Sequence, residues 1–377
     1  MIPPRSAAVP TPSSQETAEP NPAANGVADI VAAGQTRLPG NFGMNNQRAG
    51  RPTKIDLHVH VVGNGAGGTG CWYRPRGWTR WVEPWLLRSV GLGRNTLTGD
   101  LDAIYAAKLR DLVAGSSLDA AVLLAQDEPH TANGEGLADV ASFFVPNSYV
   151  LQLAETHAEF LAGISIHPGR PDALEELERG LARGAVLLKC LPNCQNIDWN
   201  DRRYTPFLER MAAAGLPLLA HTGGEHTLPV IAPTLADPRV LTRALEIGVT
   251  CIAAHCGTSS GLFDRDYFEV FADMLARHPN LYGDNSAFCV PNRRLRRRVL
   301  ETCLAHPGRI LHGSDVPVPV MGHEALARGL ISRKALGDSR RIANPIERDY
   351  RLKQALGFPP ESFTRAAELL RLPARLR

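Results

Sequence analysis

Two histidines one residue apart end the first apolar run of the sequence, which reads KIDLHVH over residues 54–60. Side chains alternate between the two faces of a β-strand, so His58 and His60 are predicted to point to the same side, two strand rises apart. Imidazoles placed side by side are what a divalent metal needs. The pair therefore indicates a metal site whose other ligands come from elsewhere in the chain.

Polar residues also stand at the ends of later apolar runs. In chain order they are His167, Lys189, His221, His255, Ser286 and Asp315. A single strand-end histidine is more often a hydrogen-bonded core residue than a ligand, and Asp315 can simply cap a turn. The ends of parallel strands in a barrel converge on one small region, however, where these groups would clash or repel without a purpose. Together they predict one functional site.

Eight short apolar runs alternate with longer amphipathic runs between residues 54 and 315. The predicted strands are 54–62, 119–125, 161–166, 185–190, 216–221, 249–255, 280–286 and 309–315. The helical patterns are 99–115, 147–158, 171–183, 204–214, 237–247, 264–278 and 291–305. Apolar strands separated by helices favour parallel pairing with both faces covered, so we expect an α/β protein with a (β/α)₈ TIM barrel.

A doubly wound open sheet is the competing architecture, and it usually has a glycine-rich phosphate loop after its first strand. Residues 63–68 (GNGAGG) have that composition. They follow two histidines, however, and lead into tryptophan-rich sequence rather than a helix start. We therefore favour the barrel.

The composition suits one large domain with a tail. The 377 residues are 44% hydrophobic and carry a formal net charge of +3, which gives no electrostatic argument for nucleic acid or a membrane as partner. Seven scattered cysteines, with neither a secretory signal nor an apolar run of 18 residues, favour a cytoplasmic protein. Residues 1–50, poor in large apolar groups, are predicted to form a flexible, disordered tail. Residues 51–377 then form the barrel with a C-terminal helical extension at 345–355 and 360–370.

Lys189 is unusual because it lies within the apolar run AVLLKC, and the chain has only five lysines among its 41 basic residues. A buried ammonium costs several kcal/mol unless it is paired or neutralised. Lys189 could pair with a carboxylate, bind a substrate anion, or become a carbamate that bridges two metals. The sequence leaves these three alternatives open.

The ordered set His58, His60, Lys189, His221, His255 and Asp315 resembles the pattern of the amidohydrolase superfamily. The local runs LAHTG, AHCG and HGSDVP are most similar to its amidohydrolase-2 branch, which includes aminocarboxymuconate semialdehyde decarboxylase and related metal-dependent hydrolases, decarboxylases and hydratases. The resemblance covers residues 54–315.

This resemblance implies a mononuclear site, in which His58, His60, His221 and Asp315 bind one divalent metal. Zn²⁺ is the expected ion, with Mn²⁺ or Fe²⁺ as alternatives, because three nitrogens and one oxygen suit them. His255 and Asp315 would act as the catalytic residues on a metal-activated water. A binuclear site with carbamylated Lys189 is the second alternative.

Substrate-binding residues are predicted around the mouth of the barrel. The loop after the first strand holds Arg74, Arg76 and four of the five tryptophans, either as a lid over an acidic substrate or as an ordinary packed insertion. His167 and Asn285 are further candidates. The basic run at 293–298 is interpreted as a solvated helix face, with nucleic-acid binding as the weaker alternative.

The predicted function is metal-dependent hydrolysis of an amide, lactone or ester-like bond in a small molecule. The alternative within the enzyme class is non-oxidative decarboxylation, or hydration, of an unsaturated or aromatic acid, since both need a Lewis acid at the same place. A non-catalytic metal-binding barrel is the alternative of another class. A homo-oligomer is also compatible with the sequence.

Overall fold

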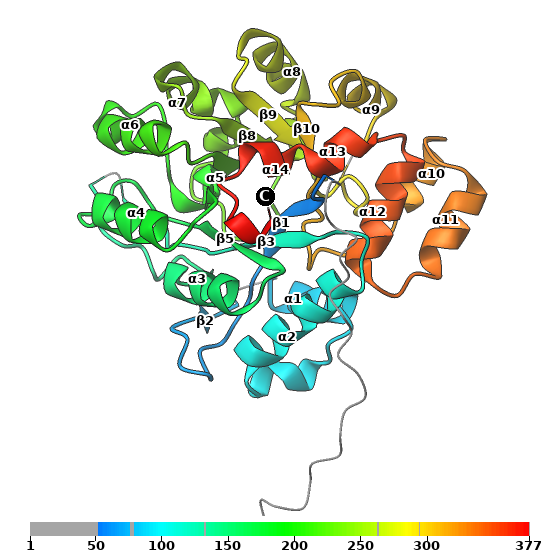
Figure 1. Ribbon diagram of the computed structural model, residues 1–377, viewed down its shortest axis with the longest axis horizontal. Helices are drawn as coiled ribbons and strands as arrows, with labels where there is room; N and C mark the ends of the chain where they lie inside the picture. Colours follow the sequence, from blue (N-terminus) through cyan, green and yellow to red (C-terminus); the bar gives the residue numbers. More distant parts are fainter. Residues whose placement is uncertain (1–51, 76–78, 132, 262–263, 294, 377) are drawn as a thin grey trace, which may run out of the picture. The chain divides into compact units, whose positions relative to one another are not determined.

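The computed structural model describes residues 52–75, 79–131, 133–261, 264–293 and 295–376. Eight parallel strands form the main sheet, with each strand beside the next one along the chain (Figure 1). They are β1 (Ile55–His60), β3 (Ala120–Leu124), β5 (Phe160–Ile164), β6 (Leu187–Cys190), β7 (Leu218–His221), β8 (Cys251–Ala254), β9 (Leu281–Asp284) and β10 (Ile310–Leu311). The predicted α/β barrel is confirmed, with strands shorter than the apolar runs.

Hydrogen bonds between β1 and the residues after β10 bring the two edges of the sheet together. The amide of Leu57 donates to the carbonyl of His312 at 3.0 Å, and the amide of His60 donates to the carbonyl of Val316 at 2.9 Å. The first and last strands are therefore neighbours, which places residues 55–60 and 310–316 at one side of the barrel.

Helices follow the strands and cover the outside of the barrel (Figure 1). They are α2 (Leu101–Ala114), α3 (Asn147–Thr156), α4 (Ala173–Ala182), α6 (Thr205–Ala214), α7 (Thr242–Ile247), α8 (Phe268–Arg277) and α9 (Arg297–Leu304), one in each predicted helical segment. Local signals fix their ends: Asp100 caps α2 by accepting from the amide of Ala103 at 3.1 Å, and Gly215, with φ of 60°, ends α6. Within the described ranges, no helix has the length and apolar character needed to span a membrane.

The C-terminal helices close the end of the barrel where the strands begin. The predicted helix at 360–370 is divided into α13 (Pro360–Thr364) and α14 (Ala366–Leu369), and α14 lies over the barrel centre in Figure 1. Ala366 and Leu370 belong to the same apolar cluster as Ile55 and Leu57. The opposite end, formed by the carboxyl ends of the strands, is left for the functional residues.

Several short elements had no clear sequence signal. They are α1 (Thr79–Ser89), β2 (Trp72–Tyr73), β4 (Phe143–Phe144), α5 (Pro192–Gln195), α10 (His323–Ala327) and α11 (Arg333–Arg340). Strands β2 and β4 form a separate antiparallel pair. The predicted helix at 345–355 is present as α12 (Pro345–Ala355), while the predicted tail at 1–50 lies outside the described residues.

The glycine-rich loop after β1 wraps around a carboxylate of α2. The amides of Asn64 and Gly65 both donate to Asp102 Oδ2 at 2.9 Å. A Cβ atom on Gly63 would stand 2.3 Å from Asp102 Oδ1, so the close approach requires glycine. Because these amides already bind a side chain of the protein, the loop is not arranged as a phosphate loop.

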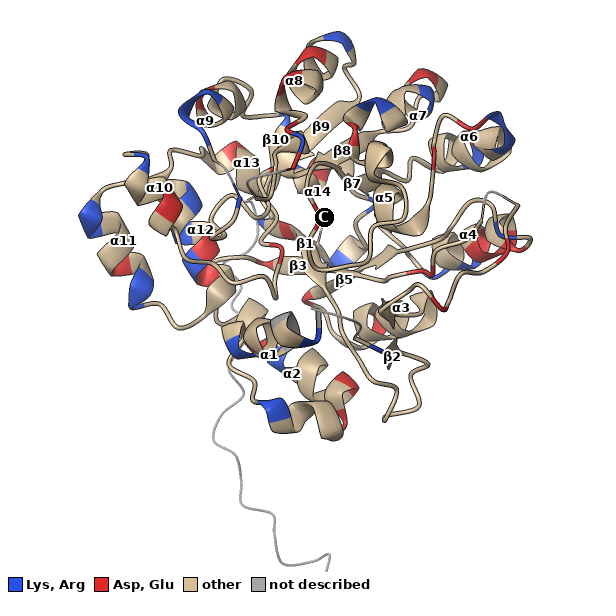
Figure 2. Ribbon diagram, turned by 180° about the vertical axis from the view of Figure 1, so that it is seen from behind, with Lys and Arg blue, Asp and Glu red and all other residues tan. Residues whose placement is uncertain are grey.

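Charged residues of both signs lie on the outer helices (Figure 2). The basic run at 293–298 was predicted to be one solvated helix face, but α9 begins only at Arg297. Arg298 pairs with Glu269 of α8 at 2.6 Å, and Arg296 pairs with Asp266 at 2.9 Å. Arg293, by contrast, is buried, so the prediction of a solvated face is wrong for this residue.

Candidate functional site

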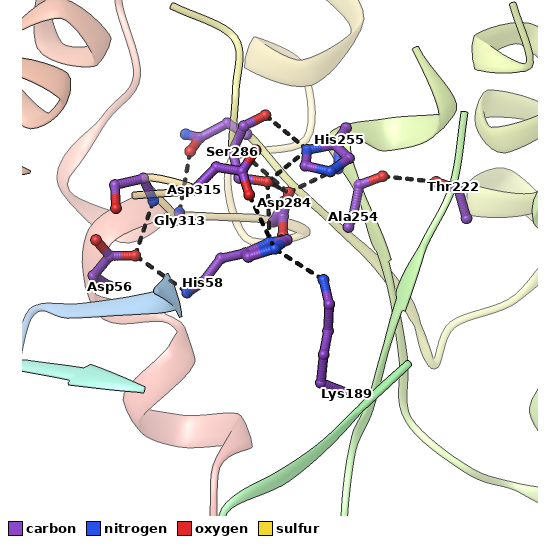
Figure 3. Close-up of polar contacts among 12 residues, drawn as sticks. Asp56, His58, Lys189, Thr222, Ala254, His255, Asp284, Ser286, Gly313 and Asp315 are labelled. Atoms are coloured by element: carbon purple, nitrogen blue, oxygen red, sulfur yellow. Dashed lines mark hydrogen bonds and ion pairs between the residues drawn. The ribbon is translucent and has the colours of Figure 1, made fainter. Parts of the chain in front are cut away.

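Side chains from six barrel strands, or from the residues after them, gather at the carboxyl end of the barrel, and Figure 3 shows His58, Lys189, His255, Asp284 and Asp315 among them. They are His58 and His60 on β1, Lys189 on β6, His221 on β7, His255 after β8, Asp284 on β9 and Asp315 after β10. The ring centroids of His58 and His60 are 5.1 Å apart, those of His58 and His255 are 5.3 Å apart, and those of His221 and His255 are 4.9 Å apart. The barrel thus brings together the residues that the sequence places at strand ends.

His58 lies at the centre of this group. Its Nδ1 atom is 2.8 Å from Asp284 Oδ2, and its Nε2 atom is 3.3 Å from Asp315 Oδ1 and 2.8 Å from Lys189 Nζ. The shorter carboxylate contact is at Nδ1, and the Lys189 ammonium beside Nε2 can only donate, so the proton of the ring is on Nδ1 and Nε2 presents a lone pair. The Nε2 lone pair and the Asp315 oxygen are both hydrogen-bond acceptors. Their close contact is favourable only when a positive charge lies beside both atoms.

Asp315 also contacts His60, the second histidine of β1. Nε2 of His60 is 3.2 Å from Asp315 Oδ1, the oxygen that also faces His58. Burial would raise the pKa of Asp315, but the neighbouring His58 and His60 hold it below its usual range. Two imidazole nitrogens and an ionised carboxylate oxygen therefore converge on one point.

Burial keeps the imidazoles of His58, His221 and His255 neutral. It lowers the pKa of His58 to about 4, with help from the nearby Lys189 ammonium, and it lowers the pKa of His221 to about 4. It also lowers the pKa of His255 well below the usual value, and Arg293 adds to this shift. Neutral imidazoles have the lone pair that a metal ligand or a general base requires.

His255 is held by the residues that follow β9. Its Nδ1 atom is 3.1 Å from the carbonyl oxygen of Ser286 and 2.8 Å from Ser286 Oγ, while Ser286 Oγ donates to Asp284 (Figure 3). Because a carbonyl only accepts, Nδ1 of His255 carries the proton and Nε2 is unprotonated. The ring lines a cavity, where Nε2 can accept a proton.

Two site residues have left-handed backbone conformations that non-glycine residues rarely adopt, with φ of 58° at His255 and 66° at Asp315. Such conformations cost roughly 1–3 kcal/mol each and persist only where the surrounding structure holds them. The amide of His255 donates to Asp284 Oδ1 at 2.8 Å, and the amide of Asp315 donates to the carbonyl of His58 at 2.9 Å. Strain at these positions is typical of a functional site.

The donor set fits a divalent metal. His58, His255 and Asp315 offer ligand atoms that all lie within 4.8 Å of one another and could hold an ion. Nε2 of His221 is buried without a hydrogen-bond partner among the described residues, and it is 3.6 Å from Glu225 Oε2. A buried nitrogen lone pair that nothing in the described chain satisfies is expected of a ligand. The cluster includes His255, which was predicted as a catalytic residue rather than a ligand.

Lys189 is buried and contacts a ligand candidate, as its position in the apolar strand suggested. Burial lowers the pKa of its ammonium. It lies 2.8 Å from Nε2 of His58. This contact is compatible with all three sequence interpretations of Lys189.

A cavity of about 130 Å³ opens beside these residues. Its polar walls come from residues of the predicted site, among them His60, His221, His255 and Asp315, and from Glu225 and Arg293. Its apolar walls include Val62, Tyr73, Leu86, Phe143, Leu191 and Leu228. The β2–β4 pair thus contributes to the wall, since Tyr73 lies on β2 and Phe143 on β4. Apolar walls with a few polar groups are typical of a site for a small organic molecule.

The other predicted substrate residues do not line this cavity. Arg74 is exposed and lies over the ring of Trp72, with 4.9 Å between the guanidinium carbon and the ring centroid. His167 packs against His130, with ring centroids 4.8 Å apart, and Asn285 is fully buried, with its side-chain oxygen 3.4 Å from the amide of Gly313. Arg76 lies outside the described residues.

Asp284 and Arg293 are the functional candidates that the sequence reasoning missed. Asp284 is the last residue of β9, and a buried carboxylate at the end of a strand is itself a signal because acidic residues are rarely buried without a partner. Arg293 belongs to a run of arginines, and among the described residues of that run its side chain alone lines the cavity. No pattern in the run distinguishes it.

Comparison with known protein families identifies the class to which this barrel belongs. The family model described as Amidohydrolase (Amidohydro_2) matches residues 55–336, so the chain belongs to the amidohydrolase family, whose members are generally metal-dependent enzymes. No curated protein matches the chain. The predicted resemblance is confirmed.

Solved structures with the same fold have low sequence identity to this chain. An uncharacterised TIM-barrel protein, Bb4693, from Bordetella bronchiseptica has 16% identity and a TM-score of 0.50, over 81% of this chain and 99% of that chain. A probable 2-pyrone-4,6-dicarboxylic acid hydrolase from Acinetobacter baumannii has 13% identity and a TM-score of 0.46, over 81% and 100%. The 5-carboxyvanillate decarboxylase LigW from Sphingomonas paucimobilis has 14% identity and a TM-score of 0.43, over 82% and 100%. At such identities, structural similarity concerns the fold alone.

Proposed function

We propose that the protein is a metal-dependent hydrolase that cleaves an amide, lactone or ester-like bond of a small molecule. The observation that carries this proposal is the convergence of the Nε2 atoms of His58 and His60 on one oxygen of Asp315, beside a cavity. His58, His60, His221 and Asp315 would hold one divalent ion, with Zn²⁺ favoured over Mn²⁺ and Fe²⁺. A bound ion of this kind supplies a Lewis acid and lowers the pKa of water toward neutrality.

The residues of the chain have separate roles in this proposal. Asp315, ionised at neutral pH, accepts a proton from the attacking water. His255 lines the cavity with an unprotonated Nε2, receives this proton and passes it to the leaving group as the bond breaks. Ser286 and Asp284 orient His255, and the apolar walls exclude bulk water from the reacting bond.

Decarboxylation or hydration of an unsaturated or aromatic acid is the second candidate. One observation favours it, namely that the buried Arg293 lines the same cavity and its positive charge suits an acidic substrate. The same metal site would serve either reaction, so the residues around the ion do not separate the two.

Metal quantification together with a substrate screen tests the proposal. The purified full-length protein is analysed for Zn, Mn and Fe and is then assayed with lactones, esters and amides for hydrolysis, and with carboxylic acids for release of CO₂. Bound metal and hydrolysis that is lost with a chelator and restored by the ion would support the proposal. CO₂ release alone would favour the second candidate, and neither bound metal nor any gain on adding it would favour a non-catalytic barrel.

A further inference from the structure

We propose that Arg293 binds a carboxylate of the substrate, so that the molecule taken into the cavity is a small organic acid with an apolar body. The inference rests on the proposed function in using the same cavity. It applies both to hydrolysis of a carboxylate-bearing lactone, ester or amide and to decarboxylation of an acid. It replaces the expectation that Arg74 is the anion-binding arginine.

The guanidinium of Arg293 is buried yet has unused donors. The side chain is only 4% exposed and lines the cavity. Its Nη1 atom donates to the carbonyl of Thr258 at 2.8 Å and contacts Thr258 Oγ1 at 3.4 Å. Its Nε atom is buried without a hydrogen-bond partner among the described residues. An unpartnered donor of a buried cation is costly, and it is expected where a ligand completes the hydrogen bonds.

The backbone holds Arg293 firmly in this position. Arg293 forms an antiparallel bridge with Ser260, and the side chain of the preceding Asn292 donates to Ser260 Oγ at 2.9 Å. The segment that carries the arginine is thus attached to the segment that follows β8 and His255. A guanidinium fixed in this way retains less freedom to lose when an anion binds.

Arg293 also lacks a direct carboxylate partner among the residues that the structure describes. No carboxylate in the described part of the chain forms an ion pair with it, although Asp315 and Glu225 line the same cavity. In the proposed site Asp315 binds the metal ion. The oxygens of Glu225 already contact Thr227, Leu228 and His221. A substrate carboxylate would supply the missing direct partner, and the planar fork of arginine matches its geometry. The apolar walls fit the remainder of such an acid.

Benzoate and its neutral isostere benzamide provide the test. Their dissociation constants are measured by calorimetry with the full-length protein, both metal-loaded and chelator-treated. We expect benzoate to bind about tenfold or more tightly than benzamide in both forms, because one charge-assisted hydrogen bond accounts for about that factor. Arg293→Gln should abolish this preference without changing benzamide binding. Arg297→Gln is the matched control, since Arg297 belongs to the same basic run but is 66% exposed, and this variant should behave as wild type.

Several results would overturn the inference. They are equal binding of the two probes to wild-type protein, binding of neither, and a benzoate preference that survives in folded Arg293→Gln. If Arg293→Gln does not fold, Arg293→Lys replaces it, with an expected intermediate loss of the preference because the charge remains and the fork is lost. The chelator-treated protein separates this inference from the proposed function: a benzoate preference without bound metal or turnover would support the Arg293 site and contradict the metal-dependent enzyme.

Discussion

Nδ1 of His58 lies 2.8 Å from Asp284 Oδ2, and both side chains are fully buried. This contact fixes the proton of His58 on Nδ1 and directs the Nε2 lone pair toward Asp315. Histidines that bind metals are commonly held in this way, with the second ring nitrogen donating to a carboxylate. Asp284 is therefore a positioning residue for the predicted metal site.

Replacing Asp284 should weaken metal binding without removing a ligand. The carboxylate uses Oδ2 for His58 and Oδ1 for the amide of His255, and the amide group of asparagine has only one acceptor. We expect Asp284→Asn to lower the affinity for Zn²⁺ by about 10- to 100-fold, measured by competition with a chelator of known affinity. Asp338→Asn, at an exposed position on α11, is the control. Unchanged affinity in a folded Asp284→Asn protein would mean that His58 needs no such support.

Ligands and catalytic residues should differ in how their removal affects metal content. We expect His58→Ala and Asp315→Ala to lose the metal, because each removes an atom from the point where ligand atoms converge. His255→Ala should retain the metal and lose turnover. Metal content by mass spectrometry and activity of the same preparations provide the measurement. Loss of metal from His255→Ala would reassign His255 as a ligand, in keeping with its place in the cluster of three.

Metal stoichiometry distinguishes the roles of Lys189. A mononuclear site predicts one metal ion per chain, no increase when bicarbonate is added, and a similar metal content in Lys189→Met. A carbamate bridge would instead predict two ions per chain, dependence on bicarbonate and loss of the second ion in the variant. We expect the mononuclear result, because the proposed site holds one ion through His58, His60, His221 and Asp315 and does not use Lys189 as a ligand. Lys334→Met, which removes an exposed lysine of α11, is the control.

Much of the fold was predictable because its signals are local. Each of the eight apolar runs overlaps one strand, although β5 begins at Phe160, just before its run, and each amphipathic segment contains one α-helix. The boundaries were too wide at 309–315, because β10 covers only Ile310–Leu311 and the polar residues of the run follow the hydrogen-bonded part of the strand. The β2–β4 pair could not be predicted, since it joins two dipeptides from distant parts of the chain.

The site was predictable where side chains end a strand and unpredictable where loops place them. His58, His60, His221 and Asp315 meet because the strand order of a barrel dictates it. The burial of Arg293 depends instead on a bridge to Ser260 after another strand, a tertiary contact that no local pattern encodes. Arg74 is the opposite case. Its position near aromatic residues suggested a substrate contact, but its side chain is exposed and does not line the cavity.

Asp102 provides a test of how the loop beside the site is held. Its carboxylate accepts from the amides of Asn64 and Gly65 and from the hydroxyl of Thr69. Burial would raise the pKa of Asp102, but these hydrogen bonds hold it below its usual range. The ionised carboxylate therefore stabilises the folded state above about pH 4, and this contribution is lost as the pH falls through the lower pKa of the folded state.

We therefore expect Asp102→Asn to lower the free energy of unfolding by about 1–3 kcal/mol at pH 7, because asparagine leaves at least one of the loop donors unsatisfied. The difference from wild type should become smaller when urea unfolding is repeated near pH 3, because protonation of Asp102 in the wild type then removes part of the stabilisation that its charge provides at pH 7. Asp111→Asn, on the same helix but exposed, should have little effect at either pH. A loss in Asp102→Asn that is equal at both pH values would assign the effect to packing of the side chain rather than to its charge, because only the charged carboxylate makes stability depend on pH in this range.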